Sequence, residues 1–294
     1  SELAVGLTST FTTSASNGTI TLNDADNTFT GAVALNTDGS SGNATIKNDR
    51  ALLLAASTVD GTLTATATAG NITQNGALAI AGATTLVTSG QGADIVLTTD
   101  TNAFTSELLI TTDETGSNKD AHVSIDGGTT NLIIGNSTID GNLTLLSGGT
   151  ITDTDGSTVT VKGTLTATTD ASASVITLND LAVDGAFTLD PDGTGAVTIV
   201  NAVNLNLAAS TMGGTFSGTA TTGDISDSGN LAITGTSNFT AANTQSVILN
   251  NNNSFTGAVT FAALSGNLKN VTITNTMALD LAAMTLAQVA SSGG

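Results

Sequence analysis

The sequence contains no cysteine, tryptophan or tyrosine, one proline and one histidine. Without cysteine the chain has no disulfides, no thiol nucleophile and no thiolate metal ligands. Only 5 lysines and arginines stand against 24 aspartates and glutamates, which leaves a net charge of −19. Nucleic acids and anionic membranes are recognised through clustered basic residues, so we expect neither as a partner.

Long hydrophobic runs are also missing. The chain has no stretch of about 18 apolar residues, so we expect no membrane insertion. Its start, from Ser1 to Thr8, lacks the basic and apolar regions of a signal peptide. The cysteine-free, acidic composition suits an extracellular location. We therefore expect a mature secreted chain or a part of a longer protein.

Internal repetition is the main feature that the sequence does contain. The segment from Leu54 to Leu86 aligns without gaps with the segment from Leu207 to Phe239, with 17 identical residues. The two segments are 153 residues apart, and shorter matches extend the alignment on both sides. The pattern predicts a tandem duplication with repeats at about 20–172 and 173–290, built from smaller modules.

Within each repeat the apolar residues alternate with polar ones. Leu63, Ala65 and Ala67 are separated by threonines, as are Val159 and Val161. A period of two is typical of strands with one buried face. The runs end at Gly, Asn or Asp, and Asp-Gly pairs at residues 60, 126, 140, 155 and 184 predict corners with positive φ.

Such short strands fit a sandwich, a propeller or a solenoid. Aromatic residues are scarce for a sandwich core, and the spacing is too irregular for propeller blades. Small apolar residues and Asn-rich corners favour a narrow solenoid interior and amide ladders. We predict an all-β fold in which residues 1–294 form a single continuous right-handed parallel β-helix. Residues 277–289 fit either further strand or a short capping helix.

The units at Gly61 and Gly141, with phrases such as GTLTATATAGNITQNGALAIAG, resemble the repeats of filamentous-haemagglutinin-like proteins. That family consists of large secreted bacterial surface adhesins. The resemblance implies a right-handed β-helix and a role in surface adhesion or extracellular scaffolding. The family's amino-terminal secretion domain is not apparent in this chain, so the resemblance implies a shaft segment.

Catalytic residues are few. Some β-helices are polysaccharide lyases or hydrolases, which use a basic residue, calcium ligands and aromatic sugar platforms. The five cations are scattered, and His122 is the only histidine. A lone histidine gives little support to a Ser-His-Asp triad or a histidine metal site. We predict no catalytic residues, no enzyme activity and no cofactor other than calcium.

Paired aspartates are the best candidates for a metal site. Asp153 with Asp155, and Asp190 with Asp192, form Asp-x-Asp-Gly sequences that resemble the start of a calcium loop. Neither loop has the glutamate that closes an EF-hand at its twelfth position. Calcium at these four residues is therefore one interpretation, and solvated corner aspartates are the other. Threonine ranks such as Thr64, Thr66 and Thr68 are interpreted as exposed strand faces.

Two functions remain from different classes. The first is a non-enzymatic rod, the shaft of a secreted or surface-attached bacterial adhesin, with a host or neighbouring cell surface as partner. The second is a subunit of an extracellular fibre, sheath or surface layer, whose copies pair head to tail through open strand edges. A polysaccharide-binding or polysaccharide-cleaving β-helix comes third.

Overall fold

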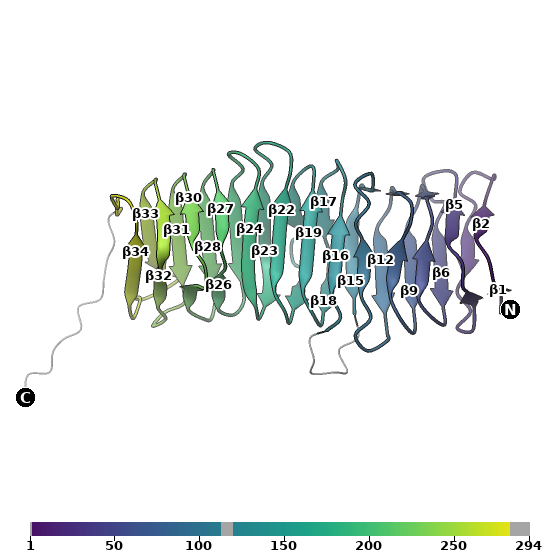
Figure 1. Ribbon diagram of the computed structural model, residues 1–294, viewed down its shortest axis with the longest axis horizontal. Helices are drawn as coiled ribbons and strands as arrows, with labels where there is room; N and C mark the ends of the chain where they lie inside the picture. Colours follow the sequence, from purple (N-terminus) through teal and green to yellow (C-terminus); the bar gives the residue numbers. More distant parts are fainter. Residues whose placement is uncertain (1, 113–119, 283–294) are drawn as a thin grey trace, which may run out of the picture.

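The chain forms an elongated parallel β-solenoid of about 12 turns, seen from the side in Figure 1. The structure is a computed structural model that describes residues 2–112 and 120–282. These residues contain strands, turns and bends but no helix, and none that could cross a membrane. The prediction of an all-β parallel β-helix is confirmed.

Two long sheets run the length of the rod, and each coil contributes strands to both. The first sheet has 14 strands: β3 (Ile20–Leu22), β6 (Ala44–Asn48), β9 (Leu63–Ala67), β12 (Thr84–Thr88), β15 (Glu107–Thr111), β17 (Leu132–Ile134), β18 (Ser137–Ile139), β20 (Ile151–Asp153), β21 (Val159–Val161), β23 (Ile176–Val183), β25 (Val197–Asn201), β28 (Phe216–Ala220), β31 (Ser237–Ala241) and β33 (Val259–Ala263).

The second sheet has 18 strands: β2 (Ser9–Thr12), β5 (Val33–Asn36), β7 (Leu52–Leu54), β8 (Ser57–Val59), β10 (Ile72–Gln74), β11 (Leu78–Ile80), β13 (Ile95–Leu97), β14 (Ala103–Phe104), β16 (Val123–Asp126), β19 (Leu143–Ser147), β22 (Leu165–Thr169), β24 (Ala186–Pro191), β26 (Leu205–Leu207), β27 (Ser210–Met212), β29 (Ile225–Asp227), β30 (Leu231–Ile233), β32 (Val247–Phe255) and β34 (Val271–Asn275). A separate pair joins β1 (Ala4–Val5) to β4 (Thr28–Phe29).

Coil length varies, whereas strand register is kept. Paired residues on successive coils are 19 positions apart between β6 and β9 and 28 apart between β13 and β16. The additional residues lie in the corners, since the strands themselves stay aligned. Among the described pairs, only β23–β25 and β32–β34 contain a shift of register, and each is a bulge.

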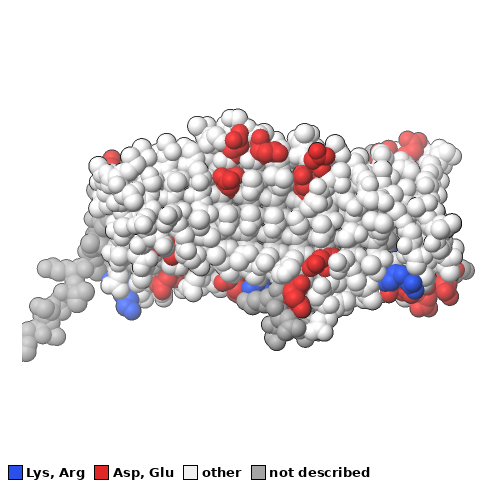
Figure 2. Space-filling model, viewed as in Figure 1, with Lys and Arg blue, Asp and Glu red and all other residues white. Residues whose placement is uncertain are grey.

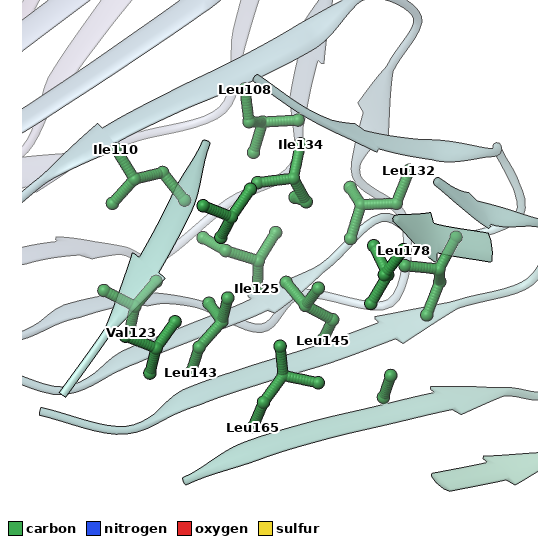
Figure 3. Close-up of a cluster of buried hydrophobic side chains, with 14 of the residues drawn as sticks. Leu108, Ile110, Val123, Ile125, Leu132, Ile134, Leu143, Leu145, Leu165 and Leu178 are labelled. Carbon is green, nitrogen blue, oxygen red and sulfur yellow. The ribbon is translucent and has the colours of Figure 1, made fainter. Parts of the chain in front are cut away.

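The alternating pattern places every second side chain inside the rod. Figure 3 shows Leu108 and Ile134 from the first sheet converging on Ile125 and Leu145 from the second. The interior consists mainly of Leu, Ile and Val, with phenylalanines such as Phe239 fully buried. The expectation of a narrow interior filled by small residues was therefore wrong. Much alanine faces outward instead, because the alternation places it on the odd side of the strand.

The duplication is visible in the strands. The bounds of β7 to β12 recur 153 positions later in β26 to β31, strand by strand and without any change of length. Buried side chains recur with them. Asn48, at the end of β6, has its counterpart in Asn201, at the end of β25, and both are fully buried.

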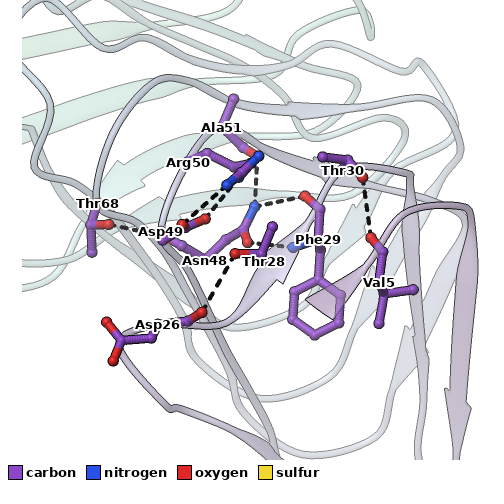
Figure 4. A network of polar contacts seen from close by, with 10 residues as sticks. All are labelled: Val5, Asp26, Thr28, Phe29, Thr30, Asn48, Asp49, Arg50, Ala51 and Thr68. Atoms are coloured by element: carbon purple, nitrogen blue, oxygen red, sulfur yellow. Dashed lines mark hydrogen bonds and ion pairs between the residues drawn. The ribbon is translucent and has the colours of Figure 1, made fainter. Parts of the chain in front are cut away.

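These two asparagines tie adjacent coils together at a corner. Figure 4 shows the Asn48 amide donating to the carbonyl oxygens of Phe29 and Ala51, at 3.0 and 2.7 Å, while its Oδ1 accepts the Phe29 N–H at 2.8 Å. Asn201 makes the same three bonds to Val183 and Asn204. Each amide therefore satisfies backbone groups that a buried corner would leave unpaired.

Glycine serves close approach more often than positive φ at the predicted Asp-Gly corners. Of those five glycines only Gly156 has a positive φ, of 76°. At Gly163 a Cβ atom would lie 2.5 Å from the carbonyl oxygen of Gly141 in the coil below. Gly163 itself donates its N–H to that oxygen at 2.9 Å. The corners therefore need glycine because the coils are stacked so closely there.

The predicted capping element lies partly outside the described residues, which end at residue 282. Residues 277–282 form no helix, and Leu281 makes an isolated parallel bridge with Val259 of β33. In this stretch the chain continues the strand stacking.

Candidate binding surface

The four aspartates proposed as calcium ligands lie in two different places on the rod. Asp153 ends β20 in the first sheet, and Asp155 follows in the next turn. Asp190 is in β24 of the second sheet, and Asp192 follows directly after that strand. The fold therefore provides two separate pairs.

Asp153 is buried and holds the bulge of the coil above it. One carboxylate oxygen accepts the N–H of Asn179 at 3.1 Å, and the other accepts the N–H of Asp180 at 2.7 Å. Burial raises the pKa of Asp153, although these backbone hydrogen bonds work in the opposite direction. Because both oxygens are used by the backbone, Asp153 acts as an internal clamp.

The same clamp occurs near the end of the rod. Asp227, at the end of β29, accepts the N–H groups of Asn250 and Asn251 at 3.0 and 3.2 Å and the Asn253 amide at 2.7 Å. The bulge in β32 lies at this point. An aspartate that ends an Ile-x-Asp strand therefore supports a bulge in the next coil at both positions.

Asp155 is exposed on the turn after β20, beside an exposed aspartate of the next coil. The carboxylate of Asp180 accepts the N–H of Gly156 at 3.0 Å. This contact uses Asp180 to hold the turn and leaves the Asp155 side chain in solvent.

Asp190 and Asp192 line the largest of the shallow grooves, which has a volume of about 430 Å³. Asp170, one coil earlier, joins them at the rim, and the floor includes Thr211 and Ala232 of the two following coils. Figure 2 shows acidic side chains gathered at the corners of the rod, with a nearly uncharged wall between them. The groove is therefore an acidic corner of a mostly neutral surface.

A related groove occurs in the first repeat. It is smaller, about 130 Å³, and includes Thr58 and Ala79, which are the counterparts of Thr211 and Ala232. Its rim carries Asp60 alone in place of the three aspartates. The acidic character thus distinguishes the second groove from the first.

The described part of the chain contains no group of three or more His, Cys, Asp or Glu side chains arranged to hold a metal ion. Calcium at Asp190 and Asp192 would need ligands from backbone oxygens, threonine hydroxyls or water, which Ca²⁺ accepts. Calcium binding at the four predicted residues stays a prediction.

His122 lies at a corner, exposed, and belongs to a ladder that links five coils. Asp94 donates its N–H to the side chain of Asn71 at 2.9 Å, and His122 donates its N–H to the side chain of Asp94 at 2.8 Å. Asn142 donates to Nδ1 of His122 at 3.0 Å, and Thr164 donates to Asn142 at 2.8 Å. An imidazole that accepts through Nδ1 carries its proton on Nε2.

This ladder is the feature that reasoning from the sequence missed. Amide ladders were expected between identical residues, but here Asn, Asp and His replace one another because each supplies an acceptor to the same backbone N–H. The signal lies in the position: each of these residues directly precedes a strand of the second sheet.

Threonines form short outward columns. Thr21, Thr45, Thr64 and Thr85 are register partners on four successive coils, and the column ends at Leu109. The interpretation as exposed strand faces agrees with this placement. Irregular coil length does not break the column, because the additional residues lie in the corners.

Comparison with known proteins gives a family without an assigned activity. A family model described as "Repeats of unknown function (DUF5649)" matches residues 1–36, 41–111, 120–191 and 194–262. The second and fourth matches begin 153 residues apart, so each long repeat holds two family units. No curated protein and no solved structure matches the chain.

Proposed function

We propose, because the chain belongs to the DUF5649 repeat family of solenoids, that it is a rigid, non-enzymatic rod. In this proposal it is the shaft segment of a secreted or surface-attached bacterial adhesin. Its resemblance to filamentous-haemagglutinin-like repeats supports an extracellular site of action. The partner would be a host or neighbouring cell surface, contacted by groups that the rod holds away from its anchor.

One observation carries this proposal: a single hydrophobic cluster runs through the coils from Ile20 to Phe261 without interruption. A solenoid in which every coil packs on its neighbours through one core and two continuous sheets resists bending. With about 12 turns at roughly 4.8 Å each, the rod would be about 60 Å long.

A distance measurement tests the rod, and the absence of cysteine makes it direct. Ser16 and Ser265 are exposed at opposite ends, so Ser16→Cys with Ser265→Cys gives two unique labelling sites. We expect single-molecule energy transfer to give one narrow distance near 50–60 Å, set by the coil spacing. A control pair, Ser16→Cys with Asn43→Cys, should give a short distance. A broad or solvent-dependent distribution for the long pair would contradict the proposal.

The adhesive role needs its own test. Beads coated with the full chain should bind bacterial or host cells more than beads coated with an unrelated acidic protein. The outcome against this role is equal binding by both beads, which would restrict the chain to a spacer.

A further inference from the structure

The large exposed apolar side chains gather at the two ends of the rod. Leu7 is 80% exposed in the first coil, and Leu264, Met277 and Leu281 are 51%, 54% and 46% exposed in the last described coil. The fifth such side chain in the described residues, Ile248, is 36% exposed on the side wall. Exposed apolar surface collected in this way marks an interaction site.

Both ends also carry strand edges. Each of β2 and β34 pairs with one neighbour, β5 and β32 respectively, in the second sheet. Ser9 and Thr13 donate their N–H groups to the β5 coil at 3.0 Å. Because donors alternate along a strand, the N–H groups of Thr10 and Thr12 face away from the rod. Free edges of this kind are templates for another strand.

The two ends match each other. They terminate the same sheets, with β2 and β34 in one and β3 and β33 in the other, and all strands are parallel. A second copy placed on the axis would therefore present its β2 to β34 in the polarity already used between coils. Phe11 and Ile273, which face inward and are only half-buried, would then cover each other.

Charge favours this arrangement over contact between two like ends. The first coil and its corner carry Glu2, Asp24 and Asp26, and the last described coil carries exposed Lys269. Two first coils would bring like charges together, whereas a first coil on a last coil brings opposite charges into proximity.

We propose that copies of this chain join end to end, the last described coil of one copy pairing with the first coil of the next. The inference rests on the proposed rod, but the labelled single molecule tests the rod alone at dilution. Assembly can fail while the rod stands.

Substitutions at the two ends test the proposal, with a side-wall substitution as the matched control. Leu7→Glu and Met277→Glu place a charge on the first and last coils, and Thr10→Pro removes an N–H from the open edge of β2 without using a bond to β5. Ile248→Glu makes the same change away from the ends.

Sedimentation and electron microscopy across a concentration series, in about 0.5 M salt to screen the net charge, give the readout. We expect the native chain to form thin filaments. Each end variant should weaken association by about ten-fold or more, while Ile248→Glu assembles like the native chain.

Mixing separates head-to-tail pairing from other modes. A copy blocked by Leu7→Glu still has its last coil, and a copy blocked by Met277→Glu still has its first, so their mixture should give dimers that neither forms alone. A native chain that stays monomeric at all concentrations overturns the proposal, even if hydrogen exchange finds β2 and β34 protected. Filaments that survive both end variants but not Ile248→Glu would also overturn it and indicate side-to-side contact.

Discussion

Thr84 and Thr88 are buried on the same strand, β12, yet only one of their hydroxyls is hydrogen-bonded. The Thr88 hydroxyl donates to the carbonyl oxygen of Ala93 at 3.1 Å, whereas the Thr84 hydroxyl has no partner. We expect Thr84→Val to raise the free energy of unfolding by about 1 kcal/mol, because it removes an unsatisfied group, and Thr88→Val to lower it by about 1 kcal/mol. Denaturant unfolding measures both. Equal effects would mean that hydroxyl pairing does not control stability here.

His122 gives a second prediction at this scale. Asn occupies the equivalent ladder positions at residues 71 and 142, so His122→Asn should keep an acceptor for the Asn142 N–H. His122→Ala removes it and should lower the free energy of unfolding by about 0.5–1.5 kcal/mol. Thermal unfolding of the two variants provides the comparison. A loss as large for asparagine as for alanine would exclude the ladder as the cause.

Asp153 predicts a pH dependence of known sign. Burial raises its pKa in the folded chain, so the folded chain binds a proton more readily than the unfolded chain. The charged carboxylate therefore destabilises the fold at neutral pH. This cost is relieved as the pH falls through the raised pKa towards the ordinary value of about 4.

We expect the free energy of unfolding to increase as the pH is lowered from 7 towards about 4. Asp153→Asn should flatten this increase, and it should also lower stability at pH 7 because the new amide N–H₂ faces a backbone N–H. Asp155→Asn, on the exposed turn, is the control and should change neither. An unchanged slope in Asp153→Asn would show that other groups set the pH dependence.

Stacked corners are the feature that matters at the scale of the element. An alanine at residue 163 would place its Cβ against Gly141 and Asn142 of the coil below. We expect Gly163→Ala to cost about 1–3 kcal/mol by overpacking. Gly6→Ala is the control, because no heavy atom lies within 4 Å of its Cβ position. Chemical unfolding decides between them, and a tolerated Gly163→Ala would mean that the coils can separate at this corner.

Strands were predictable from the sequence because their signal is local. Alternation at Leu63, Ala65 and Ala67 shows which side chains face inward, and all three are buried in β9. Corners were less predictable, since their chemistry depends on the coil above or below. Asp153 reads as a calcium ligand in the sequence, but its partners, Asn179 and Asp180, are about 26 residues away and belong to a different coil.

The whole rod should be least stable at its ends. The central strands β19 and β22 have neighbours on both sides and fully buried inward residues, whereas the inward residues of β2 and β34 are only half-buried. In dilute solution, we expect amide hydrogen exchange to be slowest in the centre and fastest in the first and last described coils. Uniform exchange along the rod would indicate all-or-none opening.

Register that is kept across coils of unequal length has a consequence for the history of such a chain. From β5 to its counterpart β24 the second sheet advances by seven coils. An unequal exchange between the two repeats would therefore add or remove whole coils, and the reading of every strand would survive. Small insertions at corners would change what the surface displays without changing the reach of the rod. Length and decoration can thus be inherited as separate traits.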